Sequence, residues 1–230
     1  MKRFYFVCLF FMVLAIHLVG IVIHNELVTV ITKPLLIPCV TAFFISASLF
    51  TPSPLKRYII TALFFSWIGD VLLLFQAGQP TFFIGGLIAF LIAHIFYIIF
   101  FYRIWITQQL KIKPVLLLLV VIFYAGLISF LLPHLNAMLI PVLVYGFVIS
   151  TMLWFALHMY LLRYKVAAAH FISGAMLFVI SDSVLAINKF YQPFSAASFI
   201  IMLTYALAQW QLIRGAVVYI GETAVTPKKQ

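Results

Sequence analysis

The residues best suited to chemistry in this sequence are two aspartates, Asp70 and Asp182, each set in a long apolar stretch. The 230-residue chain has only four acidic residues, and the others, Glu26 and Glu222, fall in a connection and near the C-terminus. Burying an ionisable group in a membrane span costs at least about 2.5 kcal/mol, so such a group indicates a function by default. Desolvation and a like-charged neighbour both favour the neutral carboxylic acid, the form that a general acid needs. The pair therefore predicts acid–base chemistry inside a membrane.

Several uncharged or titratable polar side chains occur in the same apolar stretches. These are Ser66, His94, Tyr97, Tyr145, Tyr205 and Gln209. His94 and Tyr97 are three residues apart, and Tyr205 and Gln209 are four apart, so each pair shares one face of a helix. Ser66 precedes Asp70 by one turn and could orient it. Each of these residues is alternatively a packed, hydrogen-bonded residue without a direct role, and the sequence leaves that choice open.

Other catalytic chemistries have weaker support. The six histidines form no HxxxH or HExxH pattern, so no metal site is predicted. No Gly-x-Ser-x-Gly motif is present, and neither Cys8 nor Cys39 is paired with a histidine by spacing, so a serine or thiol hydrolase lacks a visible nucleophile. The two cysteines also form no disulfide framework. We expect no metal site.

The composition identifies the elements that must position these residues. The chain is 67% hydrophobic and 8% charged, with a mean hydropathy of +1.24, which is typical of a membrane protein. Its apolar runs are long enough for helices of about 17 to 25 residues, and they exclude a β-barrel. We predict an all-α bundle of eight transmembrane helices in one domain, residues 1–220, with a short polar tail without fixed structure at 221–230. The predicted spans are 4–23, 34–50, 58–76, 81–102, 114–132, 138–161, 166–188 and 195–213.

The distribution of Lys and Arg predicts the orientation. The first span follows Lys2 and Arg3 as a signal peptide would, but it is long and lacks an Ala-x-Ala site, so we predict a retained helix. Alternating the connections between two sides leaves only Lys33 and Lys189 on one side. The other side holds Lys2, Arg3, Lys56, Arg57, Arg103, Lys111, Lys113, Arg163, Lys165, Arg214, Lys228 and Lys229. The positive-inside rule then places both termini in the cytoplasm.

The net charge of +10 is thus a topology signal, and no nucleic-acid partner is expected. Lys33 and Lys189 could bind a lipid phosphate, or they could be anchors at the membrane surface. No Lys or Arg lies inside the predicted spans, so an ion pair that neutralises either aspartate is not expected there.

The two aspartates also match in depth and in local sequence. Asp70 lies six residues before Gln76, and Asp182 lies seven before Lys189, which places both about 9 to 11 Å below the outer face. We therefore expect one cavity to contain both carboxyl groups. The stretches IGDVLL and ISDSVL share the pattern I-[GS]-D-x-x-L on the third and seventh spans. Four helices apart, they run in the same direction, as a parallel four-plus-four duplication requires, although six residues do not prove one.

These motifs resemble the YhhN-like membrane proteins, a family that includes the lysoplasmalogenases. The resemblance covers nearly the whole chain and rests on TKP at 32–34, SWIGDVLLL at 66–74, GGLIAFLIAHIFYI at 85–98, PVLVY at 141–145, GAMLFVISDSVLAINKF at 174–190 and YALAQ at 205–209.

The resemblance implies a multi-pass hydrolase of the cell (inner) membrane. Its substrate would be a lysophospholipid, a lysoplasmalogen with an ethanolamine or choline headgroup. Cleavage of the vinyl ether bond would release a fatty aldehyde and a glycerophospho-alcohol, without a cofactor or an obligatory protein partner. Asp70 and Asp182 would be the acid and the cation-stabilising base. The supporting candidates are Lys33, Ser66, His94, Tyr97, Tyr145, Ser181, Asn188, Lys189, Tyr205 and Gln209.

Two other classes of function remain open at this point. In a proton-coupled transporter, Asp70 and Asp182 would carry protons or bind a cation. Pro38 and Pro141 fall in the second and sixth spans, but the paired broken helices of such carriers are not evident. In a structural or lipid-binding bundle, both aspartates would only hydrogen-bond neighbouring helices.

Overall fold

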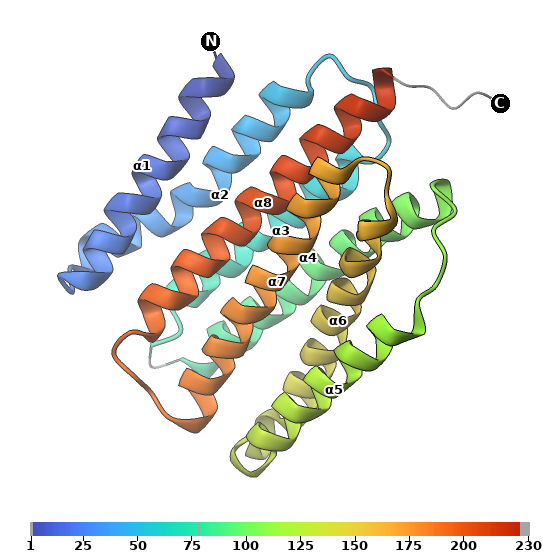
Figure 1. Cartoon of the computed structure of the whole chain (residues 1–230). Helices are drawn as coiled ribbons and strands as arrows, with labels where there is room; N and C mark the ends of the chain where they lie inside the picture. Colours follow the sequence, from blue (N-terminus) through green and yellow to red (C-terminus); the bar gives the residue numbers. More distant parts are fainter. Residues whose placement is uncertain (1, 78, 226–230) are drawn as a thin grey trace.

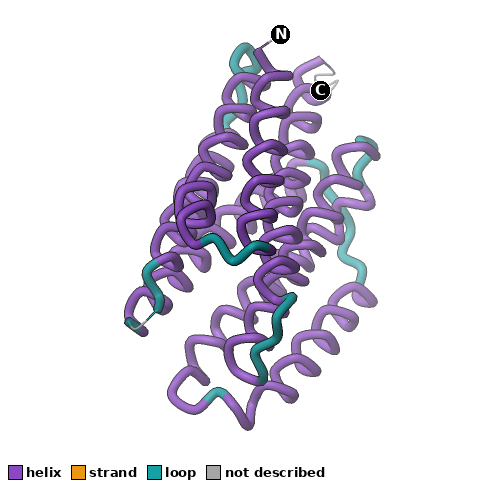
Figure 2. Tube along the Cα trace, turned by 90° about the vertical axis from the view of Figure 1, so that its left-hand side faces the viewer, coloured by secondary structure: helices purple, strands orange, loops and turns teal. Residues whose placement is uncertain are grey.

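The computed structural model describes residues 2–77 and 79–225, and it confirms a helical bundle with eight helices long and apolar enough to cross a membrane. Short connections join the helices, and the described residues contain no strand (Figure 2). The long helices are α1 (Lys2–Val22), α2 (Glu26–Ser48), α3 (Lys56–Leu74), α4 (Pro80–Thr107), α5 (Pro114–Leu131), α6 (Leu139–His158), α7 (Lys165–Ala186) and α8 (Ala197–Val225). The short ones are η1 (Leu132–His134), η2 (Asn136–Met138), η3 (Met159–Leu161) and the π-helical η4 (Ile187–Tyr191).

Helix α2 begins earlier than the sequence predicted. The predicted span began at Pro34, and proline is common at the first position of a helix. Instead, the Asn25 side chain caps the helix by accepting a hydrogen bond from the Val28 N–H at 3.1 Å, and Pro34 and Pro38 both lie inside it. Lys33 consequently lies within this span, seven residues after Glu26, and not before it.

Helix α8 is also longer than predicted. It continues to Val225, so residues 221–225 of the expected polar tail are helical. Residues 226–230 lie outside the described residues. The last turns of α8 still bury Tyr219 and Ile220, which explains why the helix continues past the apolar run that ends near residue 213.

The helices pack in a pattern that repeats between the two halves of the chain. Consecutive helices pair as α3 with α4 and as α7 with α8, while α4 also packs on α6 and α8 packs on α2. If α1–α4 are set against α5–α8, each of these contacts has a counterpart in the other half. Helices α3 and α7 run in the same direction, as predicted, and α1 and α5 lie at opposite edges of the bundle (Figure 1).

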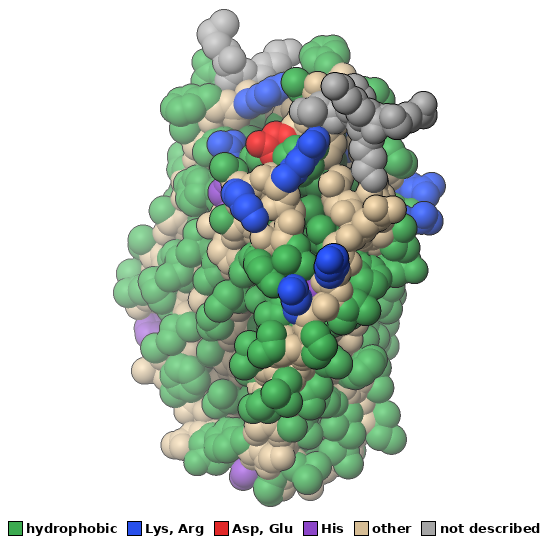
Figure 3. All heavy atoms as spheres, turned by 45° about the vertical axis from the view of Figure 1, so that its right-hand side comes forward, with side chains coloured by type: hydrophobic (Ala, Val, Ile, Leu, Met, Phe, Trp, Pro, Cys, Tyr) green, Lys and Arg blue, Asp and Glu red, His purple; other side chains and the backbone are tan. Residues whose placement is uncertain are grey.

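The two ends of the bundle differ in charge. The N-terminus and the C-terminus lie at the same end (Figure 1), and Lys and Arg side chains gather towards that end while the rest of the visible face is mainly hydrophobic (Figure 3). The helix order places ten basic residues on this side, namely Lys2, Arg3, Lys56, Arg57, Arg103, Lys111, Lys113, Arg163, Lys165 and Arg214. Lys228 and Lys229, predicted on the same side, lie outside the described residues.

Candidate active site

Asp70 is held inside the bundle by a tyrosine from α8. It lies on α3, four residues before the helix ends at Leu74, and its side chain is buried. The Tyr205 hydroxyl donates a hydrogen bond to Asp70 Oδ2 at 2.7 Å. Because Tyr205 occupies Oδ2, Oδ1 is the oxygen that would carry a proton in the neutral acid.

One helical turn after Tyr205, a glutamine on α8 connects three helices. Gln209 on α8 accepts a hydrogen bond from the Tyr97 hydroxyl at 2.7 Å and donates one to Ser66 Oγ at 3.0 Å. All three side chains are fully buried. Ser66 therefore bonds to Gln209 and not to Asp70, so the expectation that Ser66 orients Asp70 is not supported. The network instead fixes α3 and α4 against α8, and a packed network of this kind makes the position of Tyr205 rigid.

Lys33 lies near Asp70, which the sequence did not predict. Its position within α2 brings its ammonium group close enough to Asp70 for a Coulombic interaction, although the two form no ion pair within 4.0 Å in the described structure. The expectation that no Lys or Arg would lie in a span was wrong, because Pro34 does not open α2.

A tryptophan on α3 holds this part of α2 in place. Pro38 has no N–H group, so the carbonyl of Pro34 one turn earlier has no helical partner. The Trp67 indole N–H donates to that carbonyl oxygen at 3.0 Å. The contact joins α2 and α3 at the residue that follows Lys33 and about one turn before Asp70.

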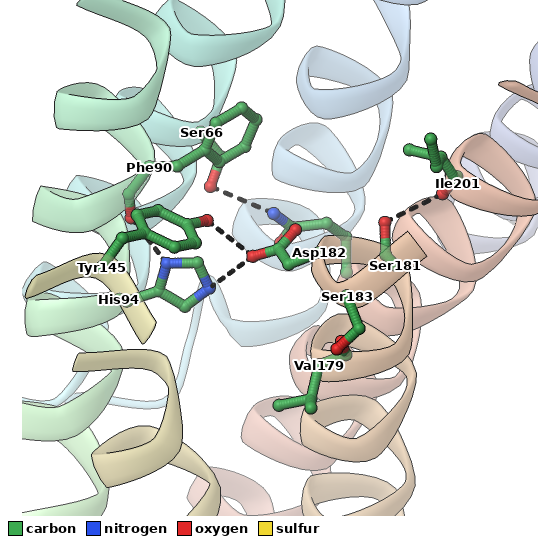
Figure 4. A network of polar contacts seen from close by, with 10 residues as sticks. Ser66, Phe90, His94, Tyr145, Val179, Ser181, Asp182, Ser183 and Ile201 are labelled. Carbon is green, nitrogen blue, oxygen red and sulfur yellow. Dashed lines mark hydrogen bonds and ion pairs between the residues drawn. The ribbon is translucent and has the colours of Figure 1, made fainter. Parts of the chain in front are cut away.

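Asp182 forms a second centre on α7. It also lies four residues before its α-helix ends, at Ala186, and its side chain is 13% exposed. The Tyr145 hydroxyl from α6 donates to Asp182 Oδ2 at 2.5 Å, and His94 Nε2 from α4 lies 4.0 Å from the same oxygen. Figure 4 shows the tyrosine and the imidazole converging on the carboxyl group. Like Asp70, Asp182 thus meets one group from the preceding helix and one from the other half of the chain.

The hydrogen-bond partners of His94 define its tautomer. His94 Nδ1 lies 2.7 Å from the carbonyl oxygen of Phe90, and a carbonyl can only accept, so Nδ1 carries the hydrogen. In the neutral ring, Nε2 then has a free lone pair directed towards Asp182. This atom is buried, and no hydrogen-bond partner for it is found among the described residues. A buried polar atom without a partner needs an explanation, and a water molecule or a ligand atom would supply one.

Aromatic rings connect the partners of the two carboxyl groups. Phe178 packs edge-on against both His94 and Tyr205, with ring centroids at 4.5 and 5.5 Å, and Phe90 packs against Tyr205 at 5.7 Å. The two centres are therefore neighbours that share this layer of rings. This layer was not predictable from the sequence, because Phe90 and Phe178 are two of 25 phenylalanines in an apolar chain.

Only Asp182 reaches a described cavity. A cavity of about 50 Å³ is lined by apolar residues of α5, α6 and α7 together with Tyr124, Tyr145, Ser150, Asp182 and Ser183. This volume is sufficient for a water molecule. Asp70 is buried and is not among the residues that line either of these two cavities. The expected single cavity with both carboxyl groups is thus not observed among these two.

Three predicted supporting residues lie away from both centres. Ser181 donates to the Ile201 carbonyl oxygen at 3.0 Å and joins α7 to α8. Asn188 accepts a hydrogen bond from the Phe194 N–H at 3.1 Å and so stabilises the connection to α8. The ammonium of Lys189 lies over the Phe83 ring, 4.7 Å from its centroid. These contacts give all three a structural role.

No group of three metal-ligating side chains occurs in the part of the chain that the structure describes. The side chains that converge at the two centres offer proton transfer by two carboxyl groups, one imidazole and two phenols.

Comparison with known proteins gives a consistent result. The model of the YhhN family matches residues 28–216. Human "Lysoplasmalogenase TMEM86B" is 33% identical over 178 residues, which cover 76% of this chain and 71% of that protein. Its mouse counterpart is 35% identical over 67% of this chain and 61% of its own length. Human "Lysoplasmalogenase TMEM86A" is 33% identical over 83% of this chain and 78% of its own length. No solved structure matches this chain.

Proposed function

Because the chain belongs to the YhhN family, we propose that it is a membrane hydrolase that cleaves the vinyl ether bond of lysoplasmalogens. The relatives named lysoplasmalogenase support the class of substrate. The observation that carries the proposal is the Asp182 carboxyl group, which faces a cavity, receives the Tyr145 hydroxyl and lies beside an unpartnered imidazole nitrogen. The products would be a fatty aldehyde and a glycerophospho-alcohol.

The first step would be protonation of carbon by Asp182. Burial favours the neutral acid, and with Tyr145 on Oδ2 its proton resides on Oδ1. Transfer of this proton to the β-carbon of the vinyl ether creates an oxocarbenium ion. The aspartate left behind is an anion that stabilises this cation, and the Tyr145 hydroxyl stabilises the anion. The use of a carboxyl group beside an oxocarbenium-like state is analogous to glycosidase chemistry.

The second step would be addition of water. A water molecule near His94 Nε2 and Asp182 attacks the cationic carbon and gives up a proton to one of these two groups, forming a hemiacetal. The hemiacetal then collapses to aldehyde and alcohol, and Asp182 regains its proton. The reaction consumes one water molecule and needs no oxidant or reductant.

Asp70 would act indirectly. Tyr205 donates to Asp70 and packs its ring against Phe90 and Phe178, so it connects Asp70 to these rings. We assign Asp70 the role of a positioning residue that fixes the ring layer against the reacting centre. This assignment differs from a direct acid–base pair, and it explains why the two aspartates need not share a cavity.

The orientation is also a proposal. The clustering of basic residues at the end with both termini supports a cytoplasmic location of that end, in the cell (inner) membrane. Asp182 would then lie in the outer half of the bilayer.

Isotope labelling tests the reaction. The purified protein in detergent is given a lysoplasmalogen in D₂O, and the released aldehyde is analysed by mass spectrometry. Protonation by an acid places deuterium on carbon 2 of the aldehyde, the former β-carbon. Aldehyde release without deuterium at that carbon, or no release from any lysoplasmalogen, would contradict the proposal.

Substitution of single carboxyl groups tests the roles proposed for Asp182 and Asp70. Asp182→Asn is expected to lower kcat by about 10² to 10⁴, while Asp70→Asn lowers it less and also reduces thermal stability. Glu26→Gln is the matched control, because it makes the same chemical change at an exposed carboxyl group. Full activity of Asp182→Asn would refute its role. Proton-dependent flux in liposomes without any hydrolysis would instead favour the transporter.

A further inference from the structure

A groove between α5 and α6 extends from the Asp182 centre towards the end of the bundle that holds both termini. Beyond the small cavity at Asp182, a larger one of about 190 Å³ is lined by residues of α5 and α6 alone. Tyr124 and Ser150 line both cavities, so the two adjoin each other. From Tyr145 to Trp154, α6 advances nine residues, or about 13 Å, along this groove.

The two helices are joined at two levels with the groove between them. The Lys113 N–H donates to His158 Nε2 at 3.0 Å at one end, and the Tyr124 hydroxyl donates to the Leu143 carbonyl oxygen at 3.1 Å near the other. Helix α5 lies at the edge of the bundle (Figure 1), and many of its apolar side chains are exposed. The groove therefore lies between two helices that are joined at these two levels, and it is open to the lipid.

The wall of the groove is suited to hydrocarbon. The hydroxyls of Tyr124, Thr151 and Ser183 all donate to helix carbonyl oxygens, those of Leu143, Phe147 and Val179. The hydrogen-bonding groups of these three side chains are thus satisfied within the protein. Away from Tyr145 and Asp182, the remaining lining is aliphatic or aromatic apart from Ser150 and the indole N–H of Trp154, which has no hydrogen-bond partner among the described residues. The carboxyl group of Asp182 lies at one end only.

We propose that this groove binds the hydrocarbon chain of the lipid substrate, with the bond to be cleaved at Asp182 and the chain running past Tyr124 and Ser150 to Trp154. The proposal rests on the proposed function. In a lysoplasmalogen the vinyl ether joins the polar glycerol part to the apolar chain, and the groove has the same order, a polar end followed by an apolar channel. A site that ends at Trp154 would also limit the preferred chain length.

Chain-length selectivity gives the first test. Thr151 lines only the larger cavity and is partly exposed, so Thr151→Phe fills the far end of the groove with little risk to folding. The ratio of kcat/KM for a long-chain over a short-chain lysoplasmalogen is expected to fall at least about tenfold. Because both kcat/KM values of a variant are measured on one preparation, their ratio does not depend on the fraction of protein that is folded.

Two further variants sharpen this test. Ser150→Leu narrows the junction of the two cavities and is expected to change the ratio in the same direction. Val144→Phe is the control, because Val144 is on α6, is 48% exposed and lines neither cavity. An unchanged ratio in both Thr151→Phe and Ser150→Leu would overturn the proposal.

A binding test does not depend on hydrolysis. The probe is a saturated 1-O-alkyl lysophospholipid with a diazirine at the chain end, which lacks the vinyl ether. Crosslinks to peptides of α5 and α6 that contain Leu117 or Trp154, prevented by excess unlabelled alkyl lysophospholipid, would support the site. Labelling that spreads over outward residues such as Val144 and is not competed would identify ordinary membrane lipid and overturn the proposal. Competed labelling without any aldehyde release would refute the proposed reaction while the lipid site stands.

Discussion

Nε2 of His94 lies 4.0 Å from Oδ2 of Asp182, too far for a direct hydrogen bond and close enough for one water molecule to contact both. The orientation of the ring follows from its other nitrogen, since Nδ1 donates to the Phe90 carbonyl oxygen at 2.7 Å. A backbone carbonyl on the same helix thus directs a basic nitrogen at the carboxyl group from another helix. The hydrogen bond at Nδ1 thus fixes the tautomer in which Nε2 can act as a general base.

His94→Asn distinguishes the roles of the two ring nitrogens. The asparagine amide N–H₂ can still donate to the Phe90 carbonyl oxygen, but the group facing Asp182 is lost. We expect kcat to fall by about a hundredfold, with a similar melting temperature in detergent. His24→Asn is the control, because His24 is exposed and its φ of 54° is a conformation that asparagine adopts readily. Unchanged kcat in His94→Asn would show that Nε2 has no part in the reaction.

Each aspartate accepts a hydrogen bond from one tyrosine, and Tyr145→Phe and Tyr205→Phe each remove one of these two hydroxyls. Tyr145 stabilises the anion that forms at Asp182, so its loss is expected to lower kcat about ten- to hundredfold. Tyr205 serves the deeply buried Asp70, so its loss is expected to reduce the free energy of unfolding by about 1 to 3 kcal/mol. Steady-state kinetics and thermal denaturation of both variants distinguish the two roles, with the exposed Tyr160→Phe as a control. Equal effects on kcat would contradict the division of labour.

The sequence was sufficient to predict the helices and most polar members of the site. Apolar runs predicted eight spans, and the helical spacing of His94 and Tyr97 and of Tyr205 and Gln209 placed these side chains on inward faces. The pairing itself was not predictable. Tyr97 bonds to Gln209 and Tyr205 to Asp70 across more than a hundred residues of chain, and such partners depend on how the helices pack.

Two features were missed for identifiable physical reasons. Proline at the start of an apolar run usually opens a helix, but the Asn25 cap and the Trp67 hydrogen bond stabilise α2 around Pro34 and Pro38. The Phe90 and Phe178 layer was invisible because its function depends on position and not on residue type. The short repeat around the aspartates, by contrast, agrees with the matched packing of α4 on α6 and α8 on α2.

Gly174 is expected to be essential for the contact of α7 with α8. A Cβ at this position would lie 2.9 Å from the backbone nitrogen of Leu212, which cannot move without moving α8. Gly174→Ala should therefore destabilise the protein by about 1 to 3 kcal/mol. Gly126→Ala on α5 is the matched control, because nothing lies within 4 Å of its Cβ, and there alanine should be neutral or slightly stabilising. Thermal denaturation in one detergent compares them, and equal melting temperatures would refute the proposed close packing.

Lys33 and Asp70 are expected to be coupled. If the Coulombic interaction between them stabilises the fold, Lys33→Met leaves the Asp70 carboxyl group without its nearby cation, and Asp70→Asn leaves the ammonium without its anion. Each single variant should lower the free energy of unfolding, and the double variant should lower it by less than the sum, with a coupling of about 0.5 to 3 kcal/mol. Lys189→Met is the control, since its ammonium contacts the Phe83 ring and not an aspartate. Additive effects in the Lys33 and Asp70 cycle would contradict this coupling.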